Sequence, residues 1–563
     1  MRGNPGRGAR CEEPEGNRKN PALGRGGCVA AAHPQAAVVG AALLAAGGNA
    51  VDAAVGTALA LTVTEPFMSG IFGASCTLLR LASGEVFALD GYAVSPQKAN
   101  ETLFEPLPPS QGLFFAREEL NELGHLAVGV PGTLAACGEM SRRWGLLPWK
   151  QLAEPAAALA AQGTRVSPLF RAFSEQNQEK LRRFEATRRI FLPGDRLPEV
   201  GELLVQTDYA VTLQRLAAEG PDYLYTGDLG ARVVRDMKEN GGLITAADLE
   251  AYRVRFREPV VGNYRGYQVH SMPQTSSGGV CLIQLLNLLE GFDLEALGFG
   301  SAEGLHLMAE AMKAVFADRY ALLGDPEHTE APVDLLISNG YAKTVRQSLN
   351  TSRAGTYNSL ADKGVDRESE ETTHFSAADG QGNLVVCTQT INGLFGSHVT
   401  VPGTGMLLNN TMRLFDPRPG LPNSVGPGKR MLSSMTPTVL SRGGRPVLAL
   451  GVPGGTRIFN TVAQVIVNVA DHGMSLQEAV EAPRTHTGTY GDGLLMESGF
   501  EERTYQELER RGHQVVRVSK VGGGMHALRN HSDGSWEGVS CWRSDGGAAA
   551  LSWGAASDLA FIF

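Results

Sequence analysis

One stretch of the chain, EETTHFSAADGQGNLVVCTQTINGLFG at residues 370–396, restricts the possible folds more than any other. Two runs of strand-forming residues flank the polar segment 380–383, a pattern that predicts a β-hairpin. The preceding residues 351–371 are polar, charged and aperiodic, which is typical of an exposed loop. Helical patterns dominate before this loop, and strand patterns interleaved with helices follow it. The sequence therefore predicts layered α/β packing.

The hairpin carries hydroxyl side chains on both arms. A turn at 380–383 pairs Thr372 with Ile391 and leaves Thr390 diagonal to Thr372; a slip by one residue stays open, and either register keeps the two hydroxyls within reach. A threonine becomes a nucleophile when its own α-amine accepts the proton, which requires a chain cut just before it. The exposed loop that ends in Glu371 offers such a place. On the hairpin alone, the interpretation that these threonines only favour a strand is preferred.

Helix signals elsewhere are consistent with this plan. Residues 50–64 are apolar on every side, which predicts a buried helix, and Asn49 stands where its cap is expected. Thr245, with Asp248 three positions later, predicts another capped helix.

Composition excludes several classes of function. The net charge is −9 with no long basic run, which argues against nucleic acid as a partner. No apolar run reaches the length of a membrane span, so no membrane association is expected. The seven cysteines are scattered without CxxC spacing, which argues against disulfides or zinc and favours a reducing, cytoplasmic location. Residues 1–29 are basic and Gly-rich without an apolar signal core, and we expect a disordered leader.

No cofactor or metal motif emerges. GVPGGT at 451–456 lacks the lysine of a phosphate-binding P-loop and the spacing of a dinucleotide fingerprint. His374, His486 and His526 have no ligand spacing, and we expect structural or surface roles for them. The sequence predicts neither a cofactor nor a metal.

Ten segments, in order from about residue 30 to the C-terminus, resemble the γ-glutamyltransferase (glutathione hydrolase) family of N-terminal-nucleophile hydrolases. They are GGNAVDAAVGTALALTVTEP, AVGVPGTLAACGEMSRRWGLLPW, GGLITAADLEAY, PQTSSGGV, ALLGDP, TTHFSAADGQGNLVVCTQTINGLFGS, GMLLNNTM, GPGKRMLSSMTPT, GVPGGTRI and EAPRTH. The resemblance implies an αββα sandwich of the N-terminal-nucleophile type, formed by two chains cut from one precursor. It divides the sequence into the leader at 1–29, a mostly helical large-subunit part at 30–371 and a small-subunit part at 372–563 that carries the nucleophile.

The resemblance also implies roles for individual residues. Cleavage between Glu371 and Thr372 would make Thr372 the N-terminal nucleophile, with its new amine as the base. Thr390 matches the threonine that orients the nucleophile. The oxyanion-hole pair matches Gly454 and Gly455, and the acyl-donor pocket matches Asn392, Ser433 and Ser434.

The positions that recognise the glutamyl group depart from the family pattern. Tyr92 stands where glutathione-processing members have an arginine for the donor's α-carboxylate. Leu414 stands where they have an acid for the α-ammonium, and Thr411 replaces a polar amide or acid. Asp416 lies two residues beyond Leu414 and is an open candidate for compensation. The stretch that forms a lid loop in some members is short here.

Three interpretations follow for the function, each with a small-molecule partner. The chain is an autoprocessed amidase or acyltransferase for a γ-glutamyl or related amide, passing the acyl group to water or an amine. Its specificity is either glutathione-like with replacement contacts, or non-glutamyl, for a dicarboxylic monoamide or a simple acyl side chain. The alternative from another class is an inactive binding paralogue, which the joint presence of Thr372, Thr390, Gly454 and Gly455 argues against.

Overall fold

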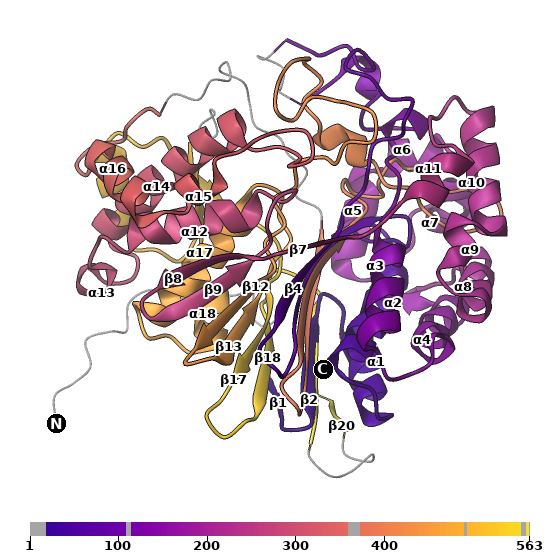
Figure 1. Ribbon diagram of the computed structural model, residues 1–563, viewed down its shortest axis with the longest axis horizontal. Coiled ribbons are helices and arrows are strands. Elements are labelled where there is room, and N and C mark those ends of the chain that lie inside the picture. The colour runs from indigo at the N-terminus through magenta and orange to yellow at the C-terminus, as the bar shows by residue number, and fades with distance from the viewer. Residues whose placement is uncertain (1–18, 109–113, 358–371, 489–492, 553–558, 562–563) are drawn as a thin grey trace.

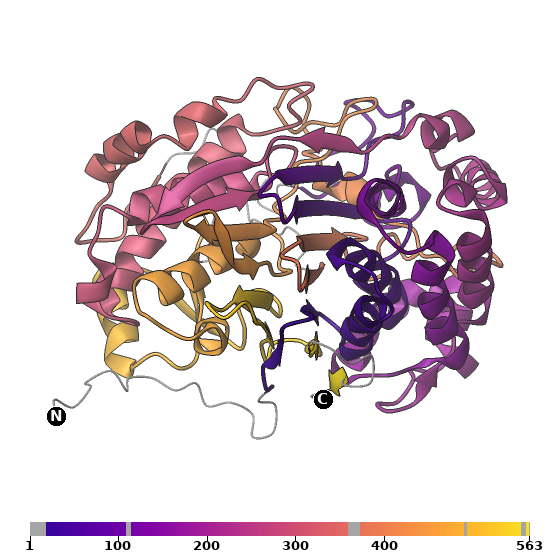
Figure 2. The same cartoon turned by 60° about the horizontal axis from the view of Figure 1, so that its bottom comes forward.

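The computed structural model describes residues 19–108, 114–357, 372–488, 493–552 and 559–561. Within these ranges two large antiparallel β-sheets face each other, and helices cover the outer face of each sheet (Figure 1). Figure 2 turns the molecule so that the strands are seen between the two helical layers. This arrangement is the layered α/β packing that the sequence patterns predicted, and the αββα sandwich that the family resemblance implied.

Each sheet combines strands from distant parts of the chain. The seven-stranded sheet has the order β1 (Ala22–Gly24), β18 (Trp536–Ser540), β17 (His526–Asn530), β13 (Arg445–Leu450), β12 (Thr438–Arg442), β9 (Tyr267–Ser271) and β8 (Val260–Tyr264). The eight-stranded sheet has the order β20 (Leu559–Phe561), β19 (Gly547–Leu551), β2 (Gly27–Ala31), β10 (Thr373–Asp379), β11 (Leu384–Thr390), β3 (Ala74–Arg80), β4 (Val86–Gly91) and β7 (Arg255–Arg257). Both sheets therefore combine strands from before and after residue 371, and the hairpin β10–β11 lies in the middle of one of them.

Two helical layers complete the sandwich. The layer against the eight-stranded sheet contains α1 (Pro34–Ala45) and α2 (Ala50–Thr64), with α3 (Thr133–Trp144), α4 (Trp149–Gln162) and α8 (Thr207–Glu219) packed around them. The layer against the seven-stranded sheet contains α12 (Gly278–Leu289), α14 (Ala302–Leu322) and α17 (Arg457–Ala470). Among the described residues, no helix has the length and apolar character needed to span a membrane.

Shorter elements connect these layers. The helices are α5 (Pro168–Gln176), α6 (Gln178–Arg182), α7 (Glu185–Phe191), α9 (Asp222–Tyr225), α10 (Asp228–Glu239), α11 (Ala246–Ala251), α13 (Leu294–Leu297), α15 (Val333–Leu336), α16 (Asn339–Ser348), α18 (Leu476–Glu481) and α19 (Glu502–Arg510). Two small sheets contain β5 (Thr164–Arg165) with β6 (Leu203–Leu204), and β14 (Thr485–His486), β15 (Leu494–Glu497) and β16 (Val515–Val518).

Helix α2 shows why the sequence folds this way. All of its residues are buried, as its apolar character on every side requires. Asn49 accepts hydrogen bonds from the Val51 and Asp52 amides, and Asp52 accepts one from the Asn49 amide, which closes a capping box. The predicted cap of α11, with Thr245 and Asp248, is a capping box as well.

The leader prediction is wrong for its last residues. Residues 22–24 form β1, which pairs with β18, and residues 27–31 form β2, which lies buried between β10 and β19. Local composition suggested disorder because the segment is Gly-rich and basic. The partners that order it lie hundreds of residues away, and such pairing leaves no local signal. Residues 1–18 are outside the described ranges.

Candidate active site

The hairpin β10–β11 brings the two predicted threonines together. The strands are antiparallel, and their register pairs Thr373 with Gln389. Continued by one residue, this register places Thr372 directly opposite Thr390, the last residue of β11. Both threonines are buried, at the end of the hairpin opposite its turn. Side chains directly opposite each other have Cβ atoms about 4.5–5.5 Å apart.

The register differs by one residue from the sequence prediction, which placed Ile391 opposite the first threonine. The cause is the turn. The Asp379 amide donates to the Asn383 carbonyl at 3.1 Å, so the loop consists of residues 380–382 and is one residue shorter than predicted. The Asp379 carboxylate accepts the Asn383 amide at 3.0 Å, and Gly382 has φ +98°. A glycine at positive φ is typical of such three-residue hairpin loops.

Thr390 belongs to a hydrogen-bonded chain that leads into the next segment. Its hydroxyl oxygen accepts the Asn392 amide at 2.8 Å. The Asn392 side chain donates to Asn410 Oδ1 at 2.9 Å and to the Asn410 carbonyl at 3.1 Å. Asn392 has φ +75°, a left-handed conformation that asparagine tolerates better than most residues. These hydrogen bonds fix the end of β11 against the segment that contains Thr411 and Leu414.

The predicted oxyanion pair lies in the loop between β13 and α17. Gly454 has φ +146° and Gly455 has φ +55°, and a Cβ on Gly454 would lie 3.1 Å from Gly522 Cα. The Arg457 amide donates to the Gly454 carbonyl at 3.0 Å, so the pair stands at the N-terminus of α17. Free amides and the helix dipole favour negative charge there.

The same loop meets β10 near the nucleophile candidate. A Cβ on Gly451 would lie 2.0 Å from His374 Cε1, so the end of β13 contacts β10 two residues beyond Thr372. Burial lowers the pKa of His374 to about 3, and its Nδ1 lies 2.8 Å from Thr388 Oγ1. His374 is therefore a neutral packing residue, as the sequence predicted. Gly454 follows three residues after this contact.

Ser433 is fixed by the start of α12. Its carbonyl accepts the Ser277 amide at 2.8 Å and the Ser277 hydroxyl at 2.7 Å, and its amide donates to the Thr275 carbonyl at 3.3 Å. Its own hydroxyl oxygen accepts the Met435 amide at 3.1 Å. Ser433 and its buried neighbour Ser434 thus lie on a segment that is hydrogen-bonded to the residues preceding α12.

Three residues, Tyr92, Leu414 and Thr411, depart from the family pattern, and none of them carries a charge. Tyr92 and Leu414 are buried in one apolar cluster, which also contains Met412, Phe415 and Met435. Leu414 ends the short helix η5 (Thr411–Leu414). The Thr411 hydroxyl is buried and donates to Asn409 Oδ1 at 2.8 Å.

Asp416 has another partner. Arg418 Nε lies 2.9 Å from Asp416 Oδ1, and Arg418 Nη2 lies 2.6 Å from Asp416 Oδ2. This bidentate pair uses both carboxylate oxygens. The charged residue of η5, Arg413, also has a partner: its Nε lies 3.1 Å from Glu122 Oε2. The two acids near Leu414, Asp416 and Glu122, are therefore each already paired with an arginine.

One residue near the site was not found from the sequence. Glu65, the C-cap of α2, is buried, and its Oε2 accepts the Thr373 hydroxyl at 2.5 Å. Burial raises the pKa of this carboxyl to about 8. It holds the residue that follows Thr372 from the face opposite the inter-sheet space. Glu65 follows an apolar helix, and no local sequence signal indicates that it would contact β10.

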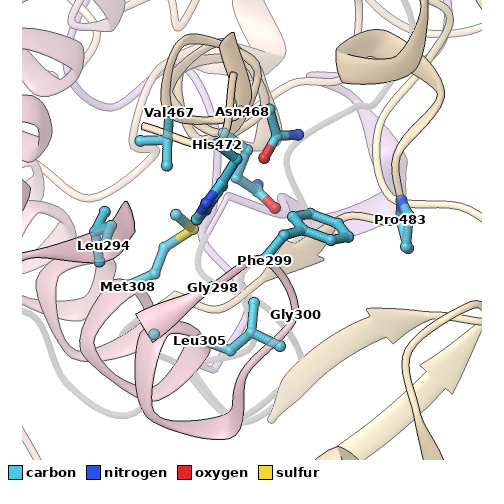
Figure 3. Close-up of a pocket in the computed structure, with 12 residues that line it drawn as sticks. Leu294, Gly298, Phe299, Gly300, Leu305, Met308, Val467, Asn468, His472 and Pro483 are labelled. Atoms are coloured by element: carbon cyan, nitrogen blue, oxygen red, sulfur yellow. The ribbon is translucent and has the colours of Figure 1, made fainter. Parts of the chain in front are cut away.

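A separate small cavity lies between α14 and α17. Its volume is about 30 Å³, room for one or two water molecules, and Phe299, Met308 and His472 are among its lining residues (Figure 3). The polar side chains of Asn468 and Gln464 in its wall donate to protein carbonyls. None of the predicted site residues lines this cavity.

Comparisons with known proteins identify the family and the fold. The sequence model of the family described as gamma-glutamyltranspeptidase matches residues 36–551. The chain belongs to the gamma-glutamyltranspeptidase family, and its αββα sandwich is that of an N-terminal-nucleophile hydrolase. It is therefore an enzyme of the hydrolase and acyltransferase kind that this family contains.

Relatives of both specificities are found. The chain is 45% identical to the Acylase ACY 1 proenzyme of Pseudomonas sp. (strain SE83) over 96% of each chain. It is 38% identical to the Glutathione hydrolase proenzyme of Escherichia coli (strain K12), over 93% of this chain and 92% of that one. Among solved structures, cephalosporin acylase from Bacillus halodurans superposes with a TM-score of 0.87 at 29% identity, covering 96% of this chain and 98% of that one.

Proposed function

We propose that this enzyme cleaves its own chain between Glu371 and Thr372 and then uses Thr372 as an N-terminal nucleophile toward an amide. The observation that carries the proposal is the hairpin register, which sets Thr372 opposite Thr390 at the point where the β13–α17 loop meets β10. Relatives named proenzymes support processing. Glu371 itself lies outside the described residues.

The proposed cleavage is an acyl shift followed by hydrolysis. Thr372 Oγ attacks the carbonyl carbon of residue 371, the peptide C–N bond breaks, and the Thr372 nitrogen leaves with a proton. Water then hydrolyses the ester, which leaves a carboxylate on residue 371 and a free amine on Thr372. Because each sheet contains hydrogen-bonded strands from both parts, we expect the two products to stay together after the cut.

Turnover uses the same atoms on a substrate amide. The Thr372 amine accepts the hydroxyl proton, Oγ attacks the amide carbon, and the proton passes to the leaving amine. Gly454 and Gly455 supply backbone N–H donors to the oxyanion, where one donor contributes about 3 kcal/mol. Water or a second amine then takes the acyl group from Thr372. Thr390 orients the nucleophile across the hairpin.

The acyl group that fits best lacks an α-ammonium. Tyr92 and Leu414 share an apolar cluster, and Asp416 is paired with Arg418. A γ-glutamyl donor therefore loses two charge-assisted contacts, each worth roughly 1.5–3 kcal/mol, or about two to four decades in kcat/KM in total. A dicarboxylic monoamide avoids burying the ammonium against Leu414. The acylase names of relatives support this specificity.

Glutathione hydrolysis is the second candidate, because a glutathione hydrolase is 38% identical to this chain. The two are separated by comparing a glutaryl anilide with the matching γ-glutamyl anilide on purified protein. We expect two fragments on a denaturing gel, the smaller beginning at Thr372, and higher kcat/KM for the glutaryl compound. A clear preference for the γ-glutamyl compound would establish the glutathione-hydrolase specificity instead.

The compartment is a separate proposal. All six cysteines in the described part of the chain are free and buried, which fits the proposed cytoplasmic location. Fractionation of the producing cell tests it, and recovery of the mature protein mainly outside the cytoplasm would contradict it.

A further inference from the structure

Three buried side chains that belong to neither the nucleophile nor the acyl pocket converge beside α14. His306 and Glu310 lie one turn apart on this helix, and His513 comes from the turn between α19 and β16. One nitrogen or oxygen from each lies within 4.8 Å of the other two. His306 Nδ1 is 2.8 Å from His513 Nε2, and His513 Nε2 is 4.0 Å from Glu310 Oε1.

Surrounding groups orient these atoms toward one another. His306 Nε2 lies 2.8 Å from the Asn350 carbonyl, which can only accept, so Nε2 carries the proton and Nδ1 presents its lone pair. Glu310 Oε2 accepts the Gly355 amide and the Tyr357 hydroxyl, each at 2.9 Å. The other oxygen, Glu310 Oε1, faces the Lys313 ammonium at 2.5 Å. A carbonyl behind a histidine is a common outer contact of metal sites.

The hydrogen bond between the two rings also assigns the proton on the second one. Because His306 Nδ1 presents a lone pair, His513 Nε2 donates the 2.8 Å hydrogen bond that joins them.

We propose that His306 Nδ1, His513 Nε2 and Glu310 Oε1 bind a divalent transition metal, with Zn²⁺ as the best match. Two imidazoles and one carboxylate form a known zinc ligand set, with bond lengths of about 2.0–2.2 Å. The 2.8 Å separation of the two nitrogens opens to accommodate an ion by small side-chain rotations. His513 shifts its ring proton from Nε2 to Nδ1, so the ligand keeps its charge. A fourth position remains for water.

Lys313 is the competitor for this ion. Its ammonium lies 2.5 Å from Glu310 Oε1 and donates to the Gly355 carbonyl at 2.7 Å. A divalent ion at the three ligands repels this ammonium, which must move away from Oε1. Lys313 therefore lowers the affinity for the metal ion without being a ligand, and removing its ammonium should strengthen metal binding.

The site would join the two parts of the chain. Asn350, Gly355 and Tyr357 precede the proposed cut, whereas His513 follows it, and the Ala354 amide already donates to the Arg511 carbonyl at 2.7 Å. If the cut is made as proposed, the ion links the end of one fragment to the other. Metal binding itself does not depend on the cut.

The test measures zinc on the full-length purified protein after chelator treatment and desalting. With Zn²⁺ alone as the probe, we expect one equivalent bound per chain and a higher Tm. His306→Gln and His513→Gln should each lose the equivalent. Lys313→Met should bind on the order of tenfold more tightly. His531→Gln, at a partly exposed histidine paired with Glu537, is the matched control and should bind like the unmodified protein.

If His306→Gln and His513→Gln both still bind one equivalent of Zn²⁺, the proposal is overturned. The zinc would then be bound elsewhere, for example at the Thr372 amine. Failure of the unmodified protein and of Lys313→Met to retain zinc would overturn it too. The Lys313 variant keeps all three ligands, so this second outcome does not depend on whether the histidine variants fold. Neither outcome bears on amide cleavage by Thr372.

Discussion

Thr390, Asn392 and Asn410 form a hydrogen-bonded chain at the end of the β10–β11 hairpin, whereas Tyr92 and Leu414 lie in an apolar cluster. These two regions are neighbours, because Asn410 directly precedes η5 and Leu414 ends it. The first region contains Thr390, the residue proposed to orient the nucleophile. In the second, Tyr92 and Leu414 carry no charge that could pair with an amino acid's α-groups. We infer that reaction chemistry and acyl recognition are separable within this fold.

The largest effect is expected from removing the nucleophile. Thr372→Ala should remain a single uncleaved chain with no measurable amide turnover, because no hydroxyl is left to form either ester. Intact mass and an anilide assay measure both outcomes. Thr372→Ser, which restores a hydroxyl, is the matched variant and should recover some cleavage. Full activity in Thr372→Ala would show that Thr372 is not the nucleophile, and the contrast between catalysis and acyl recognition would no longer hold.

The next effect concerns recognition. Replacing Tyr92 by Arg and Leu414 by Asp together should raise kcat/KM for a γ-glutamyl anilide by up to about two to four decades, the value of two regained charge-assisted hydrogen bonds. Leu414→Met keeps the cluster apolar and should leave the preference unchanged. The comparison fails if the double variant folds and shows no gain, since these positions would then not face the acyl group.

A smaller effect is expected for Thr390. Thr390→Val keeps the side-chain shape but removes the hydroxyl that accepts the Asn392 amide. We expect cleavage and turnover to slow by roughly three- to tenfold, the value of about one hydrogen bond. Thr390→Ser should restore both rates, with an unchanged Tm in each variant. Equal rates in the valine variant would show that Thr390 does not orient Thr372.

The smallest effect is a pH-dependent stability at Glu65. Burial raises the folded pKa of this carboxyl to about 8, above its ordinary value, so the folded state keeps the proton longer than the unfolded state. Between the unfolded-state and the folded-state pKa of Glu65, the free energy of unfolding falls as pH rises. Glu65→Gln stays neutral and should match the unmodified Tm at pH 5 but exceed it by on the order of a few degrees at pH 9. The exposed Glu303→Gln on α14 is the control. If the Tm of Glu65→Gln differs from that of the unmodified protein by the same amount at pH 5 and pH 9, Glu65 does not have the raised pKa.

Periodicity and caps predicted α2, α11 and the hairpin because their signals are local: apolar spacing, Asn49, Thr245 and a polar turn. The hairpin register and the strand β2 depended on features that alternation does not encode, namely the turn closed by Asp379 and a pairing with distant strands. The resemblance supplied Thr372, Gly454 and Gly455, and the structure places their elements in contact. Glu65 was missed because its meeting with Thr373 is purely tertiary.

The most direct measurement is the intact mass of the protein quenched during turnover with each anilide. The account predicts a fragment beginning at Thr372 that gains the mass of one glutaryl group, and much less adduct with the γ-glutamyl compound. An adduct on the uncleaved chain, or a γ-glutamyl adduct equal to or greater than the glutaryl one, would contradict it.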